Sequence, residues 1–501
     1  MLKLSPLFAD GAVLCRRKEL RIFGEAEDGA RVRCELRDGG GALLAEGEGK
    51  AAGGKFLILL PPQEAGTGCR LRVTDGRESL EATDLCIGEV FLAGGQSNME
   101  LELQNADEGI GLIRTHCHPL VRYFNVPKCA CFGEKRDAAW AKARWEEIRP
   151  GTGKDMSAAA YFFAVKLQEE LGVPVGIVDS YWGGTSISCW MTEEWLRETA
   201  EGTRYLEQYR QRTEGISAER YREQVRDFEE RQRSWNLAAD RMRAERPDCL
   251  WSELEAALGP FPWEPPLGPE SPFRPAGLVG TMIAPLAPVS LSGILYYQGE
   301  TDATGTESEY DTLMSGLIIR WRGIFEDESL PFLFVQLPMW TEDGRGDTGT
   351  WPALRLAQSR TRDRIRGTGM ICLLDQGEYN NIHPTNKRVV GERLCELAKR
   401  VVYGEQGREA PRVISRRIQG KQMILRADQK LGTPDGSAPA LLELAGAEGA
   451  FSPAAATLEG NELTLTAEGV DYPLHARYAW TDYGAVNLFG ENGLPLEPFA
   501  F

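Results

Sequence analysis

The stretch Gly94-Gly95-Gln96-Ser97-Asn98-Met99-Glu100 follows directly on the apolar run Val90-Phe91-Leu92-Ala93. Such a run is typical of a buried parallel strand, and two glycines permit a tight backbone path where a Cβ would clash. Ser97 is therefore expected at the carboxyl end of a strand, where open α/β sheets place their ligands. Because a free hydroxyl is a weak nucleophile at neutral pH, a reactive Ser97 needs a general base.

The chain offers only four histidines as that base: His116, His118, His383 and His475. His383 lies in a loop after the apolar strand candidate 370–374, and loops after strands commonly carry catalytic side chains. A serine early in the chain and a histidine late is also the order of α/β hydrolases. His383 is the predicted base. His116 and His118 lack the usual spacing of zinc ligands, so no metal and no cofactor is expected.

The bulk composition narrows the class of protein. The chain has 501 residues, 42% of them hydrophobic, and a formal net charge of −17, which fits about two to four globular domains. An acidic chain is a poor partner for nucleic acid or an anionic membrane surface, and no apolar run is long enough for a membrane span. The first residues lack a signal-peptide core. The eleven scattered cysteines then indicate reduced thiols, so a cytoplasmic location is expected.

The chain divides into three parts by pattern. Residues 1–85 show short alternating runs broken by glycine-rich turns, which predicts an N-terminal β-sandwich. Residues 86–404 alternate apolar strands with helices, which predicts an α/β domain with a doubly wound, mostly parallel sheet. Residues 405–501 return to short alternating runs and predict a C-terminal β-rich domain. The expected strands of the sheet are 89–93, 121–124, 175–178, 293–297, 332–336 and 370–374, and the expected helices are 157–171, 307–325, 351–366 and 387–402.

An insertion interrupts the α/β domain. Residues 192–258 are heavily charged, with aromatic residues at helical spacing, and this predicts a helical hairpin whose charged face is solvated. The proline-rich loop 260–266 follows it. Long loops in compact domains are often functional, so this loop is a candidate wall of a substrate cleft.

Two further polar loops follow predicted strands. Gly183 and Gly184 come after strand 175–178, and backbone N–H groups at such a turn can approach an oxyanion; the alternative is a plain strand-to-helix turn. Gln298 and Glu300 come after strand 293–297 and offer an amide and a carboxylate; the alternative is a solvated loop. Together with the Ser97 loop, three polar loops at strand ends predict one ligand site.

These segments together resemble the sialate O-acetylesterase family of SGNH (GDSL-like) hydrolases. The similarity spans nearly the whole chain, both β-rich ends included. It is carried by Gly95-Gln96-Ser97-Asn98-Met99, Asp179-Ser180-Tyr181-Trp182-Gly183-Gly184-Thr185, Tyr297-Gln298-Gly299-Glu300, Ile382-His383-Pro384 with Lys387, Arg274-Pro275-Ala276-Gly277-Leu278, Met282-Ile283-Ala284-Pro285-Leu286, Arg477-Tyr478-Ala479-Trp480 and Gly493-Leu494-Pro495-Leu496-Glu497-Pro498-Phe499.

The resemblance implies an SGNH-type sheet and hydrolysis of O-acetyl esters on sialic acid, or in some relatives on other sugars. Ser97 would attack the acetyl carbonyl, and His383 would take its proton and later activate water. The N–H groups of Ser97 and Gly184 and the Gln298 amide would hold the oxyanion. The implied partner is an O-acetylated sugar, and the oligomeric state, a homodimer included, stays open. Substrate contacts are expected at Gln96, Asn98, Trp182, Asn381 and Arg274.

One departure from the family concerns the acid that orients the histidine. Many relatives carry an aspartate two or three residues before it, where this chain has Asn380 and Asn381. An Asp→Asn change in a serine protease triad costs about 10⁴ in turnover. Glu300 is the first candidate for a substitute and Asp375 the second; a Ser–His dyad is the alternative. An acetylxylan-type esterase and an inactive sugar-binding homologue are the competing functions.

Overall fold

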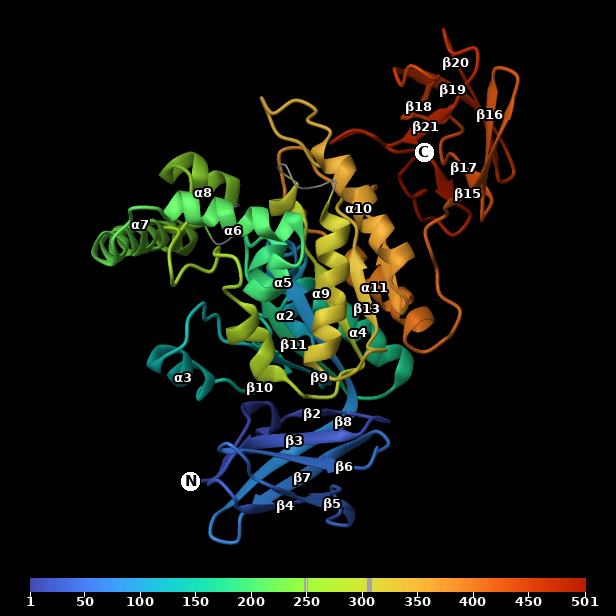
Figure 1. The fold of residues 1–501 in the computed structure, drawn as a ribbon. Helices are drawn as coiled ribbons and strands as arrows, with labels where there is room; N and C mark the ends of the chain where they lie inside the picture. Colours follow the sequence, from blue (N-terminus) through green and yellow to red (C-terminus); the bar gives the residue numbers. More distant parts are fainter. Residues whose placement is uncertain (247–248, 250, 304–308) are drawn as a thin grey trace.

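The computed structural model describes residues 1–246, 249, 251–303 and 309–501. It shows an N-terminal β-domain, a central α/β domain and a C-terminal β-domain, arranged in chain order with the α/β domain between the other two (Figure 1). The mixed α/β architecture and the β-rich C-terminus that the sequence predicts are confirmed.

The N-terminal strands form two sheets. Alternation along the chain buries one face of each strand, as in β4, where Val32, Cys34 and Leu36 are buried between more exposed neighbours. One sheet has the order β1-β3-β6, and in the other β4 pairs with β5 and β7, and β7 pairs with β8. The strands are β1 (Lys3–Leu4), β2 (Val13–Cys15), β3 (Leu20–Glu25), β4 (Arg31–Arg37), β5 (Leu43–Lys50), β6 (Lys55–Leu60), β7 (Gly66–Thr74) and β8 (Ser79–Gly95).

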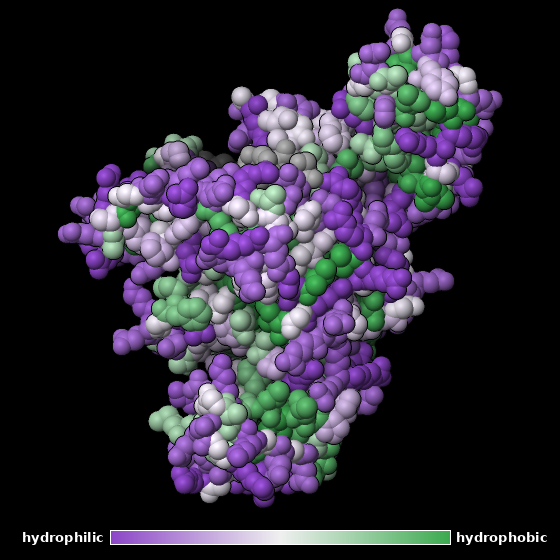
Figure 2. Space-filling view, in the orientation of Figure 1, coloured by the Kyte–Doolittle hydropathy of each residue, from purple (hydrophilic) through white to green (hydrophobic). Residues whose placement is uncertain are grey.

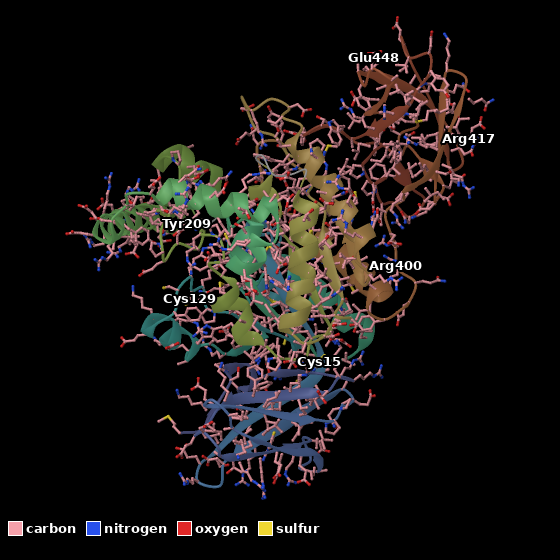
Figure 3. The ribbon with its side chains drawn as sticks, viewed as in Figure 1. Cys15, Cys129, Tyr209, Arg400, Arg417 and Glu448 are labelled. Atoms are coloured by element: carbon pink, nitrogen blue, oxygen red, sulfur yellow. The ribbon has the colours of Figure 1, made fainter. Side chains whose placement is uncertain are left out.

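Strand β8 belongs to two domains. Its first half pairs with β7 and β2 in the N-terminal domain, and its second half pairs with β11 and β12 in the central sheet. Residues 85 and 86, the expected domain boundary, therefore lie inside one continuous 17-residue strand. Cys15, labelled at this junction in Figure 3, places its Sγ 3.4 Å from the Oγ of Ser292, which also accepts the N–H of Val90.

The central sheet has the order β10-β9-β11-β8-β12-β13-β14. All neighbours in it are parallel except the edge strand β10, which is antiparallel to β9. The chain places β9 and β11 on one side of β8 and β12 to β14 on the other, so the winding reverses at β8. Such a switch point opens a crevice at the carboxyl ends of the strands. The strands are β9 (His118–Asn125), β10 (Trp145–Ile148), β11 (Val175–Tyr181), β12 (Gly293–Tyr297), β13 (Phe332–Val335) and β14 (Thr368–Ile371).

Helices cover both faces of this sheet (Figure 1). On one face Phe91 of β8 packs edge-on against Phe163 of α4, with ring centroids 4.8 Å apart. On the other, a Cβ on Gly94 would contact Trp321 of α9 at 3.3 Å, as expected because side chains alternate along a strand. The helices of this domain outside the insertion are α1 (Ser97–Glu100), α2 (Gly109–Thr115), α3 (Glu134–Trp140), α4 (Ala158–Leu171), α9 (Tyr310–Ile324), α10 (Thr350–Arg364) and α11 (Lys387–Val401).

The described residues of the insertion form four helices rather than the two of the predicted hairpin: α5 (Glu193–Arg197), α6 (Ala200–Thr213), α7 (Ala218–Glu245) and α8 (Trp251–Leu258). The difference comes from helix caps. The side chains of Thr192, Thr199 and Ser217 each accept a backbone N–H of the following turn, so each starts a new helix. Trp235 and Ala239 of α7 and Leu254 of α8 form a small core of their own.

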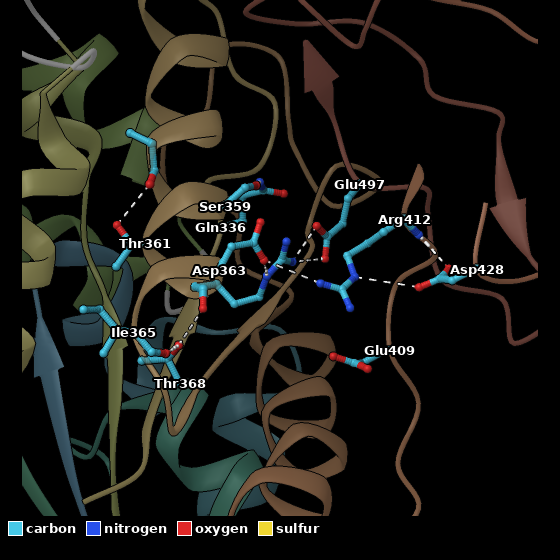
Figure 4. Close-up of polar contacts among 12 residues, drawn as sticks. Gln336, Ser359, Thr361, Asp363, Ile365, Thr368, Glu409, Arg412, Asp428 and Glu497 are labelled. Carbon is cyan, nitrogen blue, oxygen red and sulfur yellow. Dashed lines mark hydrogen bonds and ion pairs between the residues drawn. The ribbon is translucent and has the colours of Figure 1, made fainter. Parts of the chain in front are cut away.

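The C-terminal domain packs on the central domain through an apolar cluster that includes Met339, Cys372 and Leu374, and through charged groups on α10. Both carboxylate oxygens of Glu497 accept from Nη1 of Arg362 at 2.6 Å, and Arg412 lies 3.6 Å from Asp363 (Figure 4). The strands of this domain are β15 (Val413–Gln419), β16 (Gln422–Ala427), β17 (Leu431–Gly432), β18 (Leu442–Ala445), β19 (Phe451–Glu459), β20 (Glu462–Ala467), β21 (His475–Tyr478), β22 (Phe489–Gly490) and β23 (Phe499–Ala500).

Hydrophilic residues cover most of the face shown in Figure 2. Across the described part of the chain, no helix combines the length and the apolar character needed to cross a bilayer. The same residues contain no group of three or more His, Cys, Asp or Glu side chains that could hold a metal ion. None of the described cysteines is joined to another in a disulfide.

Candidate active site

Ser97 and His383 meet at the carboxyl end of β8. The Oγ of Ser97 lies 2.8 Å from Nε2 of His383, although the two residues are 286 positions apart. Gly95 makes the turn before Ser97 feasible, because its φ is +135° and a Cβ there would lie 2.1 Å from the carbonyl oxygen of Tyr297. The close approach of β8 and β12 thus fixes where the serine emerges. The structure brings the predicted nucleophile and base within hydrogen-bond distance.

His383 is held in its neutral form. The residue is exposed overall, but the removal of water around its ring and, second, the positive charge of Lys387 lower its pKa to about 4. An imidazole that is neutral at pH 7 can accept the proton of Ser97. Because this pKa is low, His383 becomes protonated, and so stops acting as a base, only in acid.

This pKa predicts the acid limit of activity. Ester hydrolysis needs neutral His383, so kcat/KM for acetate release should stay level from pH 7 to about pH 5 and fall as the pH drops through about 4. If His383 had the ordinary histidine pKa of about 6.5, the enzyme would lose half of its activity near pH 6.5. The test is a discontinuous acetate assay between about pH 3 and 8, with the fold checked at each pH by circular dichroism. A midpoint between about pH 6 and 7 would contradict the shift.

The second predicted loop lies against Ser97. A Cβ on Gly183 would come within 3.4 Å of the Cβ of Ser97, and the Gly183 N–H donates to Oε2 of Glu100 at 2.5 Å. Gly184 has φ +74°, which favours glycine. Within the described residues neither the Gly184 N–H nor the Ser97 N–H has a hydrogen-bond acceptor. Both donors are therefore available to an oxyanion formed at Ser97.

The structure corrects the role expected for Gln298. Its Nε2 is directed to three internal acceptors: Oδ2 of Asp302 at 2.5 Å, Oε1 of Gln96 at 3.0 Å and the carbonyl of Thr185 at 3.2 Å. Its Oε1 accepts the hydroxyl of Tyr310 at 2.7 Å. An amide has two N–H donors, so none is left for an oxyanion. Gln298 instead ties the three polar loops together.

Glu300 and Asn98 also take part in an internal network. Nδ2 of Asn98 donates to Oε1 of Glu300 at 2.5 Å and to the carbonyl of Ile382 at 2.9 Å, and Oδ1 of Asn98 accepts from Nζ of Lys387 at 2.6 Å. Burial raises the pKa of Glu300 and lowers that of Lys387 to about 7, against the pull of the Glu300 carboxylate. Asn98 is therefore not the substrate contact that the resemblance implies. It fixes the backbone beside His383.

No described carboxylate orients the His383 ring. Glu300 bonds Asn98, and Asp375 forms an ion pair with Arg393 at 2.6 Å, so neither expected acid takes this role. Nδ1 of His383 has no hydrogen-bond partner among the described residues. The geometry is that of a Ser–His dyad.

Asn380 and Asn381, which precede His383, form hydrogen bonds with other residues of the chain. Oδ1 of Asn381 accepts the backbone N–H of His383 at 3.0 Å, and its Nδ2 donates to Glu378 at 2.7 Å. The Asn380 amide pairs with the backbone N–H and the carboxylate of Asp343. An aspartate at position 380 would place two carboxylates together. Both asparagines shape the loop, and Asn381 is committed to it rather than to substrate.

The remaining expected substrate contacts lie around the loops. Gln96 is buried, and its Oε1 accepts hydrogen bonds from Nε2 of Gln298 and from the backbone N–H groups of Gly299 and Thr301. Trp182 is half-buried, and its backbone N–H donates to the carbonyl of Gly95. Arg274 donates from Nη2 to the carbonyl of Ala130 at 3.2 Å, while its buried Nε has no partner within the described residues.

The sequence did not single out Asp302, which anchors the same loops. This buried carboxylate accepts the N–H of Ile187 at 2.9 Å, the Gln298 amide and the hydroxyl of Tyr205. Burial raises its pKa to about 6. Asp302 stands two residues after Glu300 in the third polar loop, and this position could have indicated that it belongs to the site. Tyr205 comes from the insertion and shows only helical spacing.

The chain is similar to several known esterases. Residues 278–400 match the family described as carbohydrate esterase, sialic acid-specific acetylesterase. Sialate O-acetylesterase of Mus musculus is 26% identical over 77% of this chain and 70% of its own length, and that of Homo sapiens 24% over 77% and 68%. A carbohydrate acetylesterase from Xanthomonas citri matches with a TM-score of 0.77 and 29% identity over 100% of this chain and 99% of its own.

The fold, the Ser97–His383 pair and these relatives identify the chain as a carboxylic ester hydrolase. Within that class the chain is similar to sialate O-acetylesterases and to a carbohydrate acetylesterase, as the sequence motifs indicate.

Proposed function

We propose that the protein is a serine O-acetylesterase that removes acetyl groups from sialic acid through an acetyl-serine intermediate. The observation that carries the proposal is the 2.8 Å contact between Ser97 Oγ and His383 Nε2, beside two backbone N–H groups without an acceptor among the described residues. Ser97 attacks the acetyl carbonyl while His383 takes its proton. The N–H groups of Ser97 and Gly184 stabilise the oxyanion.

His383 then acts in the opposite direction. It gives the proton to the leaving sugar oxygen, and the acetyl group stays on Ser97. A water that loses its proton to His383 attacks the acetyl-serine, the bond between the acetyl carbon and Ser97 Oγ breaks, and His383 returns the proton to Oγ as acetate leaves. No carboxylate bonds the His383 ring, so no negative charge directly stabilises the imidazolium that forms in each step. The Asn381 contact to the His383 N–H and the Asn98 contact to the Ile382 carbonyl support the position of the ring by fixing the backbone around it.

Two observations support sialic acid as the sugar. The matched family and the mammalian relatives are described by that substrate. Arg274 forms no ion pair with any described acidic residue, and the hydrogen bond of its guanidinium within the described residues is the one from Nη2 to the carbonyl of Ala130. A guanidinium in this state suits the carboxylate of a sialic acid. The Xanthomonas citri relative is named only as a carbohydrate acetylesterase, so an acetylated neutral sugar is the second candidate.

A substrate panel separates these candidates. We expect kcat/KM for O-acetylated sialic acids to exceed that for acetylated xylo-oligosaccharides by at least about tenfold, because only the former carry a carboxylate for Arg274. The measurement is acetate release from both series at equal concentration. Arg274→Gln should lower the rate on sialic acids and leave the rate on xylo-oligosaccharides unchanged.

Higher rates on the xylo-oligosaccharides, with no effect of Arg274→Gln, would favour an acetylxylan-type activity. Binding of both sugars with no acetate release from either would favour a sugar-binding homologue. Ethyl acetate, which has no sugar, serves as the control for the intact Ser97–His383 pair.

A further inference from the structure

Trp263 stands in the proline-rich loop 260–266, and none of the proposed catalytic steps uses it. Its side chain is 54% exposed. A single exposed aromatic residue is ordinary on a protein surface, so exposure by itself indicates nothing. The position of this indole beside the Ser97 site is the observation that points to a role.

The Trp263 ring lies against the oxyanion loop. A Cβ on Gly184 would meet Cζ3 of Trp263 at 2.7 Å and Cε1 of Phe273 at 3.1 Å. The neighbouring Gly183 faces Ser97 at 3.4 Å in the same way. Gly184 thus lies against the indole, and the adjacent Gly183 lies against the nucleophile. Gly184 leaves room for the indole at the edge of the site.

The loop that carries Trp263 is fixed by the helical insertion. Nε2 of Gln232 on α7 donates to the carbonyl of Pro262 at 3.0 Å, and Nε1 of Trp235 donates to the carbonyl of Gly259 at 2.9 Å. The Phe261 N–H donates to Glu255 of α8 at 3.2 Å. The residues directly before Trp263 are thus tied down on two helices, while the indole itself stays exposed.

The ring orientation is also set. Trp263 packs edge-on against Phe273, with ring centroids 6.2 Å apart and an interplanar angle of 81°. Its indole N–H has no hydrogen-bond partner among the described residues. A rigid aromatic face with a free donor at its rim combines an apolar surface with a polar handle, as ligand sites commonly do.

We propose that Trp263 is the stacking platform for the sugar ring of the acetyl ester, an inference that rests on the proposed carbohydrate esterase function. In this proposal the carbonyl oxygen lies at the Gly184 N–H, the leaving sugar oxygen lies within reach of His383, and the sugar ring lies on the side of the site where Trp263 stands. The C–H face of a pyranose ring covers the indole face, and the indole N–H can donate to a ring hydroxyl. The insertion then has a role in specificity, because it holds this platform.

Kinetics of Trp263→Ala on two substrates test the platform. We expect kcat/KM for the best acetylated sugar to fall about 10- to 100-fold, since an aromatic contact of this size is lost. The rate on ethyl acetate, which has no ring to stack, should change less than about threefold. Trp263→Phe keeps an aromatic face and should recover most of the sugar activity. Tyr472→Ala, which removes an exposed aromatic ring from the C-terminal domain, is the matched control.

The outcomes are distinct. Equal kcat/KM on the sugar for Trp263→Ala and the wild type would overturn the platform, and so would equal losses on the sugar and on ethyl acetate. A wild type that hydrolyses ethyl acetate but no acetylated sugar would overturn the proposed function, and the platform with it. Calorimetric binding of the acetylated sugar to Ser97→Ala, with and without Trp263→Ala, checks the same contact without turnover.

Discussion

Replacing Ser97 with alanine should lower kcat for 4-nitrophenyl acetate by about 10⁵- to 10⁶-fold, the usual cost of removing a serine nucleophile. The reason is that Oγ is the atom that forms the covalent intermediate, and it already lies 2.8 Å from its base. The change removes one small atom at the surface of the site, so thermal unfolding should stay within a few degrees of the wild type.

Ser290→Ala provides the matched control, because within the described part of the chain that hydroxyl bonds the carbonyl of Glu19 alone. It should leave kcat unchanged. Trapping of labelled acetate on the wild-type protein, and not on Ser97→Ala, would identify the acetyl-serine directly by mass spectrometry. Equal rates for wild type and Ser97→Ala would remove Ser97 from the reaction.

Replacing His383 with alanine should cost about 10⁴- to 10⁶-fold in kcat, and combining it with Ser97→Ala should cost no more than the larger single loss. The two residues act as one unit, because the serine is unreactive without a base and, without Ser97, no acetyl-enzyme forms for His383 to hydrolyse. The measurement is single-turnover acetate release by the three variants. His475→Ala is the control, since its Nδ1 contacts the Phe501 carbonyl in the C-terminal domain, far along the chain from the Ser97 loop.

Losses that multiply in the double variant would mean that Ser97 and His383 act independently. Retention of most activity by His383→Ala would exclude it as the base. Recovery of activity by added imidazole would support the assignment, because a free base can then enter the space that the ring leaves.

The amino-acid sequence is sufficient to predict the parts of this site that depend on the backbone. Apolar runs followed by glycines predict the strand ends, and parallel strands bring their ends together. The sequence pattern therefore assigns Ser97, Gly184 and His383 to one edge of the sheet, and the order β9-β11-β8-β12 places the first two there.

The roles of the buried polar side chains cannot be predicted in the same way. From the sequence and the resemblance, Gln298 is expected to hold the oxyanion and Glu300 to orient His383, because an amide can donate hydrogen bonds and a carboxylate can accept them. In the structure the Gln298 amide donates hydrogen bonds to Gln96 and Asp302. The Glu300 carboxylate accepts a hydrogen bond from Asn98. A buried polar group must find a partner, and that partner depends on which loops meet in three dimensions. Lys387 illustrates this, since only the fold places its ammonium beside Asn98.

The insertion is harder still to predict. Its charge and helical spacing predict helices, but the pattern contains no signal that Tyr205 reaches Asp302 or that Gln232 holds the Trp263 loop. Such long-range contacts arise from loop geometry that periodicity does not encode.

Strand β8 determines whether the N-terminal domain can be separated from the central domain. Because one strand runs from Ser79 to Gly95, the N-terminal sandwich has no hinge against the sheet and cannot serve as a detachable accessory module. Truncating the chain before Ser79 would strip β2 and β7 from Leu80–Gly88 and expose an unpaired strand edge. We expect the sandwich and the sheet to unfold as one cooperative unit. Changes far from the substrate, inside the sandwich, would then disturb the turn that presents Ser97.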